Sequence, residues 1–164
     1  VRTALGLLAT LGVILLSGDD LKAERARTMG ADATINYRTQ PNWSAQVLDL
    51  TNGRGADLIL ELGGQETLAH SLNSVTVGGR IAIIGVLSGL SASIPIPPIL
   101  FRHIHMTGIT VGHRSDMRAM CAAIDLQGLK PVIDGHYSFD QAPDVYAALP
   151  QGRHFGKLVI DISV

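Results

Sequence analysis

The chain has 164 residues, of which 46% are hydrophobic, 16% charged and only 4% aromatic, and its formal net charge is −1. These values predict one domain with a sizeable core and exclude a disordered chain or a coiled coil. The single cysteine excludes an internal disulfide and a cysteine-rich zinc site, and no basic block favours nucleic acid or an anionic membrane. We therefore predict a cytoplasmic protein without nucleic-acid or membrane partners.

The first segment, Val1–Leu16, has one early arginine and then an almost charge-free apolar run. This pattern is typical of a signal peptide core and is too short for a comfortable membrane span. The favoured alternative is a helix over Thr3–Leu11, ended by Gly12, and then a strand over Val13–Leu16. The segments that follow continue the same alternation of helix and strand. The chain does not begin with methionine, so we expect a fragment of a longer protein.

Two helices and a strand follow. We predict helices over Leu21–Met29, ended by Gly30, and over Pro41–Leu50, with a strand over Ala33–Asn36 between them. Asp19 or Asp20 can cap the first helix, and Asn42 or Thr39 the second. In the second helix, three residues share the predicted buried face: Trp43, Val47 and Leu50.

The central stretch is predicted to contain a strand over Leu58–Leu62, a helix over Thr67–Val75 and a strand over Ile81–Ile84. Gly63-Gly64 breaks the first strand, and Gly78-Gly79 is expected to stop the helix. Both strand runs are apolar on both faces, with one acid, Glu61, near the end of the first, and this is typical of parallel strands covered by helices on each side. Such a unit has a right-handed crossover, and ligands bind beyond the carboxyl ends of its strands. Gly63-Gly64 and Gly85-Val86 are therefore candidate binding turns.

The remaining predicted elements lie beyond Gly89. After a loop over Ser91–Pro98, we predict a helical turn, a strand ended by Gly112, a helix, two extended pieces, a helix capped by Asp140, and a last strand. Met117, Met120 and Ile124 are expected on an inner helix face, with Cys121 a buried structural thiol. The fold class is α/β, a doubly wound parallel sheet of six or seven strands. In chain order, the elements after the loop are the helical turn Ile99–Ile104, the strand His105–Val111, the helix Arg114–Leu126, the extended pieces Pro131–Ile133 and His136–Phe139, the helix Asp140–Leu149 and the last strand Leu158–Ile162.

The turn after Val13–Leu16 carries a chemical signal. In dinucleotide-binding folds, an acid at this strand end selects NAD, whereas a neutral residue with nearby cations accommodates the 2′-phosphate of NADP. Ser17 can donate to a phosphate, Lys22 supplies charge, and Tyr37 can donate or pack on adenine. The alternative is a helix cap, a surface lysine and a half-buried tyrosine.

Other chemistry is sparse. No G-x-G-x-x-G motif is present, so the phosphate-binding first turn is missing. His103 and His105 could place two rings on one strand face, but no third metal ligand is near, so we assign no metal. His113 could face a cofactor, His70 is expected at the surface, and His136 and His154 have no assigned partner. No nucleophile triad or carboxylate pair is evident.

Four motifs in their order together resemble one family. They are ERARTMGADATINYR (Glu24–Arg38), TNGRGADLILELGG (Thr51–Gly64), SLNSVTVGGRIAIIGVLSG (Ser71–Gly89) and GRHFGKLVIDI (Gly152–Ile162). The chain resembles the cofactor-binding half of medium-chain dehydrogenases/reductases, the zinc-type alcohol dehydrogenase and quinone oxidoreductase group. Ala4–Gly12 is similar to the end of that family's first Rossmann helix, which argues against a signal peptide.

This resemblance implies a Rossmann-like domain over residues 1–164 that lacks the first strand, its glycine-rich turn and the catalytic domain with any zinc ligands. We also expect a step two residues shorter than usual between Gly12 and Val13, and either truncation or pairing with another copy. Family dimers often form through the strand near His105–Val111. Positions implied to bind cofactor are Ser17, Gly18, Lys22, Tyr37, Leu62, Gly63, Gly64, Gly85, Val86, Leu87, Gly112, His113, Phe155 and Lys157, with Val111 beside them.

The first functional hypothesis is the NADP- or NAD-binding part of an oxidoreductase that moves hydride between nicotinamide and an alcohol, carbonyl or quinone. The chain alone is expected to be inactive, because the resemblance assigns no catalytic residue to it. The second is a degenerate Rossmann remnant that acts as a scaffold. A third, an S-adenosylmethionine methyltransferase, is disfavoured because it needs an acid where Ser17 stands.

Overall fold

The computed structural model describes residues 12–162. In this range the chain forms two compact units, residues 12–115 and residues 116–162. The predicted helix over Thr3–Leu11 lies outside the described residues, and the single domain over 1–164 stays a prediction. Among residues 12–162, no helix has the length and apolar character needed to cross a membrane.

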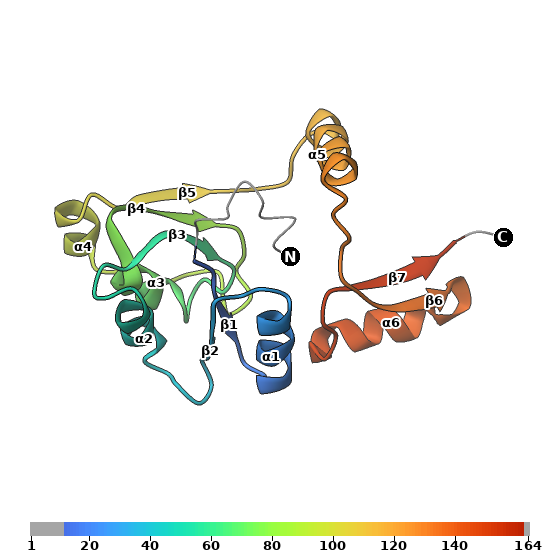
Figure 1. The fold of residues 1–164 in the computed structure, drawn as a ribbon, viewed down its shortest axis with the longest axis horizontal. Helices are drawn as coiled ribbons and strands as arrows, with labels where there is room; N and C mark the ends of the chain where they lie inside the picture. The colour runs from blue at the N-terminus through green and yellow to red at the C-terminus, as the bar shows by residue number, and fades with distance from the viewer. Residues whose placement is uncertain (1–11, 163–164) are drawn as a thin grey trace. The chain divides into compact units, whose positions relative to one another are not determined.

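Helices and strands alternate through the first unit, as predicted (Figure 1). The strands form two ladders, β1-β2 and β3-β4-β5, and every pair in them is parallel. The predicted parallel α/β organisation is thus confirmed. The elements are β1 Ile14–Ser17, α1 Asp20–Thr28, β2 Ala33–Asn36, α2 Trp43–Leu50, β3 Ala56–Glu61, α3 Leu68–Ser74, β4 Val75–Ile83, α4 Ile96–Phe101 and β5 His105–Gly108.

The start of α1 follows the predicted capping chemistry. Asp19 has extended backbone geometry, and its Oδ1 accepts a hydrogen bond of 3.0 Å from the backbone N–H of Lys22. Asp20 adds a negative charge in the first turn, which stabilises the positive end of the helix dipole. Gly30, at φ 105°, follows the helix in the left-handed region.

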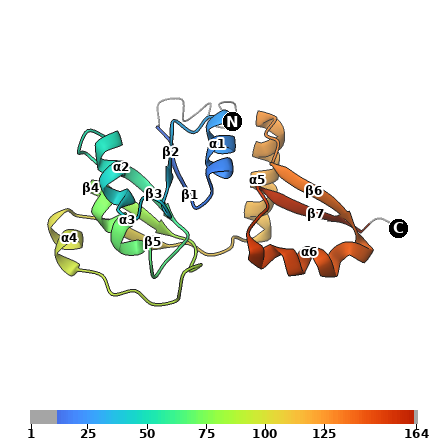
Figure 2. The same ribbon diagram turned by 90° about the horizontal axis from the view of Figure 1, so that it is seen from below.

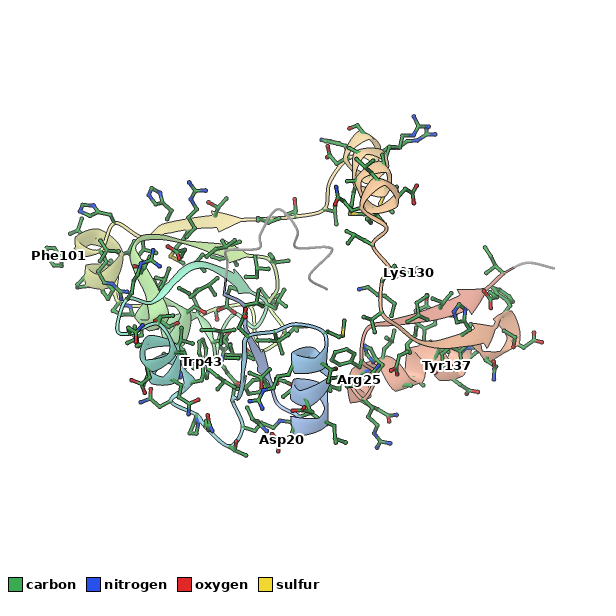
Figure 3. All side chains as sticks on the ribbon, viewed as in Figure 1. Asp20, Arg25, Trp43, Phe101, Lys130 and Tyr137 are labelled. Atoms are coloured by element: carbon green, nitrogen blue, oxygen red, sulfur yellow. The ribbon has the colours of Figure 1, made fainter. Side chains whose placement is uncertain are left out.

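The core beside β2 contains Ile35, Trp43 and Val47, which pack against Ile14 and Leu16 of β1 and Ala56 of β3. Trp43 lies on the side of α2 that faces these strands (Figure 3). Leu50 was predicted to share this face, but half of its surface is exposed. Val47, in the same last turn, is buried, so only part of that turn packs against the strands. Asn42 stands at the cap, where its Oδ1 accepts from the Ser44 hydroxyl at 3.4 Å but from no backbone N–H of the helix.

The predicted stop at Gly78-Gly79 is wrong. α3 ends at Ser74, β4 begins at once with Val75, and both glycines lie inside that strand. The register steps from Ala56 opposite Val75 to Leu58 opposite Arg80, so β4 carries extra residues there. Gly78 takes φ 70° within this irregularity, a value that glycine adopts without steric cost.

Within residues 12–162, the β3-β4-β5 ladder is covered on one face only. Ile59 and Ile81 face α3 and belong to a core with Leu72, Val75 and Ile104. Leu58 and Leu60, on the opposite face of β3, are 56% and 62% exposed. The prediction of cover on both faces is therefore wrong for the described chain, because α2 and α3 lie on the same side of the ladder (Figures 1 and 2).

Arg102 ties α4 to the end of α3. Its Nη1 donates to the carbonyl of Leu72 at 3.0 Å, and its Nη2 donates to the carbonyl of Val75. These carbonyls lie where α3 passes into β4, so the guanidinium satisfies acceptors that the helix leaves open. α4 itself starts at Ile96 rather than at the predicted Ile99, because Pro97 and Pro98 fit the first helical turn. Phe101 lies on its outer side (Figure 3).

Replacing Arg102 with methionine is expected to lower the free energy of unfolding by about 2 kcal/mol, since it removes two charge-assisted hydrogen bonds and keeps the aliphatic stem. Urea denaturation measures the loss. Arg80→Met, at an exposed position of β4, is the matched control and is expected to change stability by less than about 0.5 kcal/mol. Equal effects of the two substitutions would contradict this role for Arg102.

The second unit pairs two parallel strands, β6 Ile133–Ser138 and β7 Lys157–Asp161. The helix α6, Ala142–Ala148, lies along them (Figure 2) and buries Val145. Short 3₁₀ turns, η1 Phe139–Gln141 and η2 Leu149–Gln151, flank it. Asp140 was predicted as the cap of this helix, but Gln141 is the N-cap of α6, and Ser138 caps the preceding η1 in a capping box with Gln141.

The helix α5, Arg114–Gln127, has no buried residue. Met117 and Met120 are about half exposed, and Cys121 is exposed. The predictions of an inner face and of a buried thiol are therefore wrong in this chain, because nothing in the described residues covers the apolar side of α5. The preceding strand also ends earlier than predicted, at Gly108 rather than before Gly112.

Candidate functional site

The first candidate cluster lies where β1 and β2 end together. The parallel register places Ser17 opposite Asn36. The Ser17 hydroxyl accepts from the backbone N–H of Asp19 at 3.2 Å and donates to the Asp19 carbonyl at 3.0 Å. This serine therefore holds the turn that leads into α1, and its proposed contact with a phosphate stays a prediction.

Gly18 lies against the side chains that follow β2. A Cβ atom at Gly18 would meet both Tyr37 Oη and Arg38 Nε at 2.8 Å, so a larger residue would displace them. Asn36 organises this turn, since its Oδ1 accepts from the Arg38 backbone N–H at 3.0 Å and its Nδ2 donates to Asp20 Oδ1 at 2.7 Å. The structure thus brings Gly18, Tyr37 and a guanidinium together.

Arg38 was not among the predicted site residues. It follows Tyr37 directly, but nothing in the spacing says that it reaches Gly18, twenty residues away. The parallel register of the two four-residue strands brings them together. The signal available in the sequence was a second cation, beside Lys22, at the end of the neighbouring strand. Lys22 lies in the first turn of α1, and Tyr37 is 43% exposed, as the alternative interpretation of a half-buried tyrosine expected.

The second candidate cluster joins the turns after β3 and β4. Backbone N–H groups of Ile84 and Gly85 donate to the Glu61 carbonyl at 2.8 and 3.1 Å, and that of Leu87 donates to the Leu62 carbonyl at 3.2 Å. A Cβ atom at Gly85 would lie 2.5 Å from the oxygen of Leu62. The two turns therefore touch through their backbones, and only glycine fits at this crossing.

Ser88 completes the connection between the turns. Its backbone N–H and its hydroxyl both donate to the carbonyl of Gly63, at 2.8 and 2.9 Å. The Ser88 Oγ also accepts from the backbone N–H of Glu66 at 2.9 Å. Gly64, at φ 89°, forms an isolated bridge with Gly89. The predicted residues Leu62, Gly63, Gly64, Gly85, Val86 and Leu87 thus form one connected backbone surface.

Glu61 lies beneath this surface and is only 3% exposed. Its Oε1 accepts from the N–H groups of Gly63 and Gly64 at 2.8 and 3.0 Å and from Thr67 Oγ1 at 2.5 Å. Its Oε2 accepts from the Ser71 hydroxyl. Burial alone raises the pKa of this carboxyl, but the hydrogen bonds from Ser71, Thr67 and the two glycines outweigh burial and hold the pKa below its ordinary value.

Four predicted site residues lie outside the elements that form these two clusters. Gly112 and His113 lie beyond the end of β5, in the approach to α5. Phe155 and Lys157 belong to the second unit, where the Lys157 backbone N–H donates to the Val132 carbonyl at 2.9 Å. Their contact with a cofactor stays a prediction.

Two histidines, His70 and His103, lie in surroundings that differ from those predicted. His70 was expected at the surface but is partly buried; its Nδ1 lies 3.1 Å from Ser44 Oγ, and its ring centroid lies 5.1 Å from that of Trp43. His103, at φ 51°, lies in the turn before β5, so it does not share a strand face with His105. Within residues 12–162, no three histidine, cysteine, aspartate or glutamate side chains group closely enough to hold a metal ion.

Residues 3–125 match the protein family described as zinc-binding dehydrogenase. The chain belongs to this family. A zinc-type alcohol dehydrogenase-like protein of Schizosaccharomyces pombe is 36% identical over 161 residues, which cover 96% of this chain and 46% of that protein. The family's description names zinc, but among residues 12–162 no group of histidine, cysteine, aspartate or glutamate side chains could hold a metal ion.

Solved structures confirm the Rossmann-like fold of this family member. A protein of Sinorhizobium meliloti 1021, assigned as an alcohol dehydrogenase, has a TM-score of 0.87 and 41% identity, and the match covers 98% of this chain and 46% of that one. An NAD-dependent alcohol dehydrogenase has a TM-score of 0.86 and 30% identity, with 98% and 47% covered. The chain therefore spans about half the length of the proteins it matches. The resemblance to medium-chain dehydrogenases/reductases is confirmed.

Proposed function

We propose that this chain is the nicotinamide dinucleotide-binding part of an oxidoreductase that transfers hydride between the cofactor and an alcohol, a carbonyl or a quinone, with NADP(H) preferred. The observation that carries this proposal is the contact of Gly18 with Tyr37 and Arg38 where β1 and β2 end. The bound nicotinamide supplies the hydride chemistry, while the chain binds and orients it.

The preference for NADP(H) follows from charge and space. A 2′-phosphate needs cationic or neutral donors and the absence of an acid at the strand end. Ser17 takes the place of that acid, Arg38 and Lys22 supply positive charge, and Gly18 leaves room for the Tyr37 and Arg38 side chains to lie against the turn. The nearby carboxylates are engaged, Asp19 by the Lys22 backbone N–H and Asp20 by the Asn36 side chain.

The connected turns after β3 and β4 suit the other half of the dinucleotide. Their glycines leave the backbone uncovered, so a ribose and a nicotinamide ring can approach closely. The contacts of the cofactor with Gly112, His113, Phe155 and Lys157 are predicted from the family resemblance alone. In the intact protein, the small-molecule substrate and the catalytic groups are proposed to lie outside this chain, which is inactive alone, cytoplasmic and paired as a homodimer through the edge strand β5.

A second candidate function is a scaffold that folds and associates without binding a nucleotide. Two observations favour it. The chain contains no G-x-G-x-x-G turn, and the face of the β3-β4-β5 ladder that carries Leu58 and Leu60 is exposed. A well-folded chain that binds neither NADPH nor NADH would establish the scaffold in place of the cofactor domain.

Titration of the chain with NADPH and NADH, followed by cofactor fluorescence and by the melting temperature, tests the proposal. We expect tighter binding of NADPH, and we expect Arg38→Ala and Lys22→Ala each to weaken NADPH roughly tenfold while NADH changes little. Arg27→Ala, at an exposed position of α1 that pairs with Glu24 at 3.7 Å, is the matched control for loss of one positive charge. An equal effect of Arg38→Ala on both cofactors would contradict the 2′-phosphate contact.

A further inference from the structure

Glu61 is the residue at which the two strand-end turns meet. Its carboxylate accepts from the N–H groups of Gly63 and Gly64, the turn after β3. Its backbone carbonyl accepts from the N–H groups of Ile84 and Gly85, the turn after β4. One residue therefore determines where both turns lie.

Hydrogen bonds already engage both oxygens of the carboxylate. Oε1 accepts three hydrogen bonds, Oε2 accepts one from Ser71, and the residue is 3% exposed. A buried carboxylate held in this way is a poor proton donor or acceptor toward a substrate, because its ionised form is already satisfied. Its contribution is geometric.

The engagement of both glycine N–H groups also limits what the turn can bind. A turn that recognises phosphate presents free backbone N–H groups to the anion. At Gly63 and Gly64 these N–H groups donate hydrogen bonds inward to the Glu61 carboxylate. The turn therefore presents α-carbons and peptide faces instead. Such a surface suits an uncharged group rather than a phosphate.

We propose that Glu61 is a positioning residue for the uncharged nicotinamide–ribose half of the dinucleotide, acting through the Gly63-Gly64 and Gly85-Val86 backbones. This inference rests on the proposed function. It assigns a role to an acid that touches no ligand itself and that lies under the binding surface. A preorganised turn binds more tightly than a mobile one, because less conformational entropy is lost when the ligand arrives.

The test compares two ligands on the same chain. NADPH carries both halves of the dinucleotide, whereas adenosine 2′,5′-bisphosphate carries only the adenosine half with its 2′-phosphate. Glu61→Gln preserves shape and removes the charge, and Thr67→Val removes one donor to Oε1 with little change in volume. Glu66→Gln, an exposed carboxylate five residues further on, is the matched control.

We expect Glu61→Gln to weaken NADPH roughly five- to tenfold, Thr67→Val to weaken it about two- to threefold, and neither to change the affinity for the bisphosphate by more than about twofold. Glu66→Gln is expected to change neither affinity. Equal weakening of both ligands in a folded variant, or no weakening of NADPH, overturns the positioning role and leaves the proposed function intact. Failure of the unsubstituted chain to bind either ligand overturns the proposed function and this inference with it.

Discussion

Replacing Ile81 with alanine is expected to lower the free energy of unfolding by about 3 kcal/mol. Ile81 lies on the central strand β4, is 1% exposed, and packs with Leu72, Val75 and Ile104. The substitution removes three carbon atoms from a site enclosed by β3, α3 and β5, so the chain loses transfer free energy and gains a cavity. Urea denaturation followed by circular dichroism measures the change.

Leu60→Ala is the matched control for this prediction. Leu60 lies on the adjacent strand β3, opposite Ala82, and belongs to the uncovered face. Its truncation is expected to cost less than about 1 kcal/mol, because most of its surface is already in contact with water. A cost equal to that of Ile81→Ala would show that another copy or another segment covers this face in solution.

The second large effect concerns the buried carboxylate. Glu61→Ala is expected to lower the free energy of unfolding by about 3 kcal/mol near neutral pH, because it leaves four donors below the turn without their acceptor. Glu66→Ala, at an exposed position of the same turn, is expected to cost less than about 0.5 kcal/mol. Chemical denaturation of the two variants against the unsubstituted chain checks the prediction.

This contribution is expected to depend on pH with a definite sign. The folded pKa of Glu61 lies below the ordinary value of 4.5, so the unfolded chain binds more protons in the acid range. The stabilisation is present above the unfolded pKa and is lost as the pH falls through the folded pKa. The difference in unfolding free energy between the unsubstituted chain and Glu61→Gln should therefore shrink from about pH 6 to about pH 3. A difference that grows on acidification would contradict this assignment.

Much of the local structure could be predicted from the residues alone. The bounds of β2 are those predicted, Asp19 caps α1, and Gly30 ends it. These features depend on neighbours within a few residues, such as a side-chain oxygen that reaches an N–H group of the next turn. The family also followed from short motifs in order.

The candidate site was predictable in part. The turns at Gly18, Gly63-Gly64 and Gly85 were recognised because glycine marks places where a backbone must turn or be approached closely. Arg38 and Glu61 were missed as site residues. The first reaches Gly18 through the pairing of β1 with β2, and the second reaches the turn from beneath. Both depend on contacts between elements.

The alternation of helices and parallel strands, the capping of α1 and the dehydrogenase family of this chain all follow from the residues alone. Which apolar faces are covered depends instead on tertiary packing. Periodicity places Leu50, Leu58 and Met117 on apolar faces, yet all three are exposed. The physical reason is that a repeat along one element shows which residues share a face, whereas burial requires a second element, distant in sequence, to pack against that face.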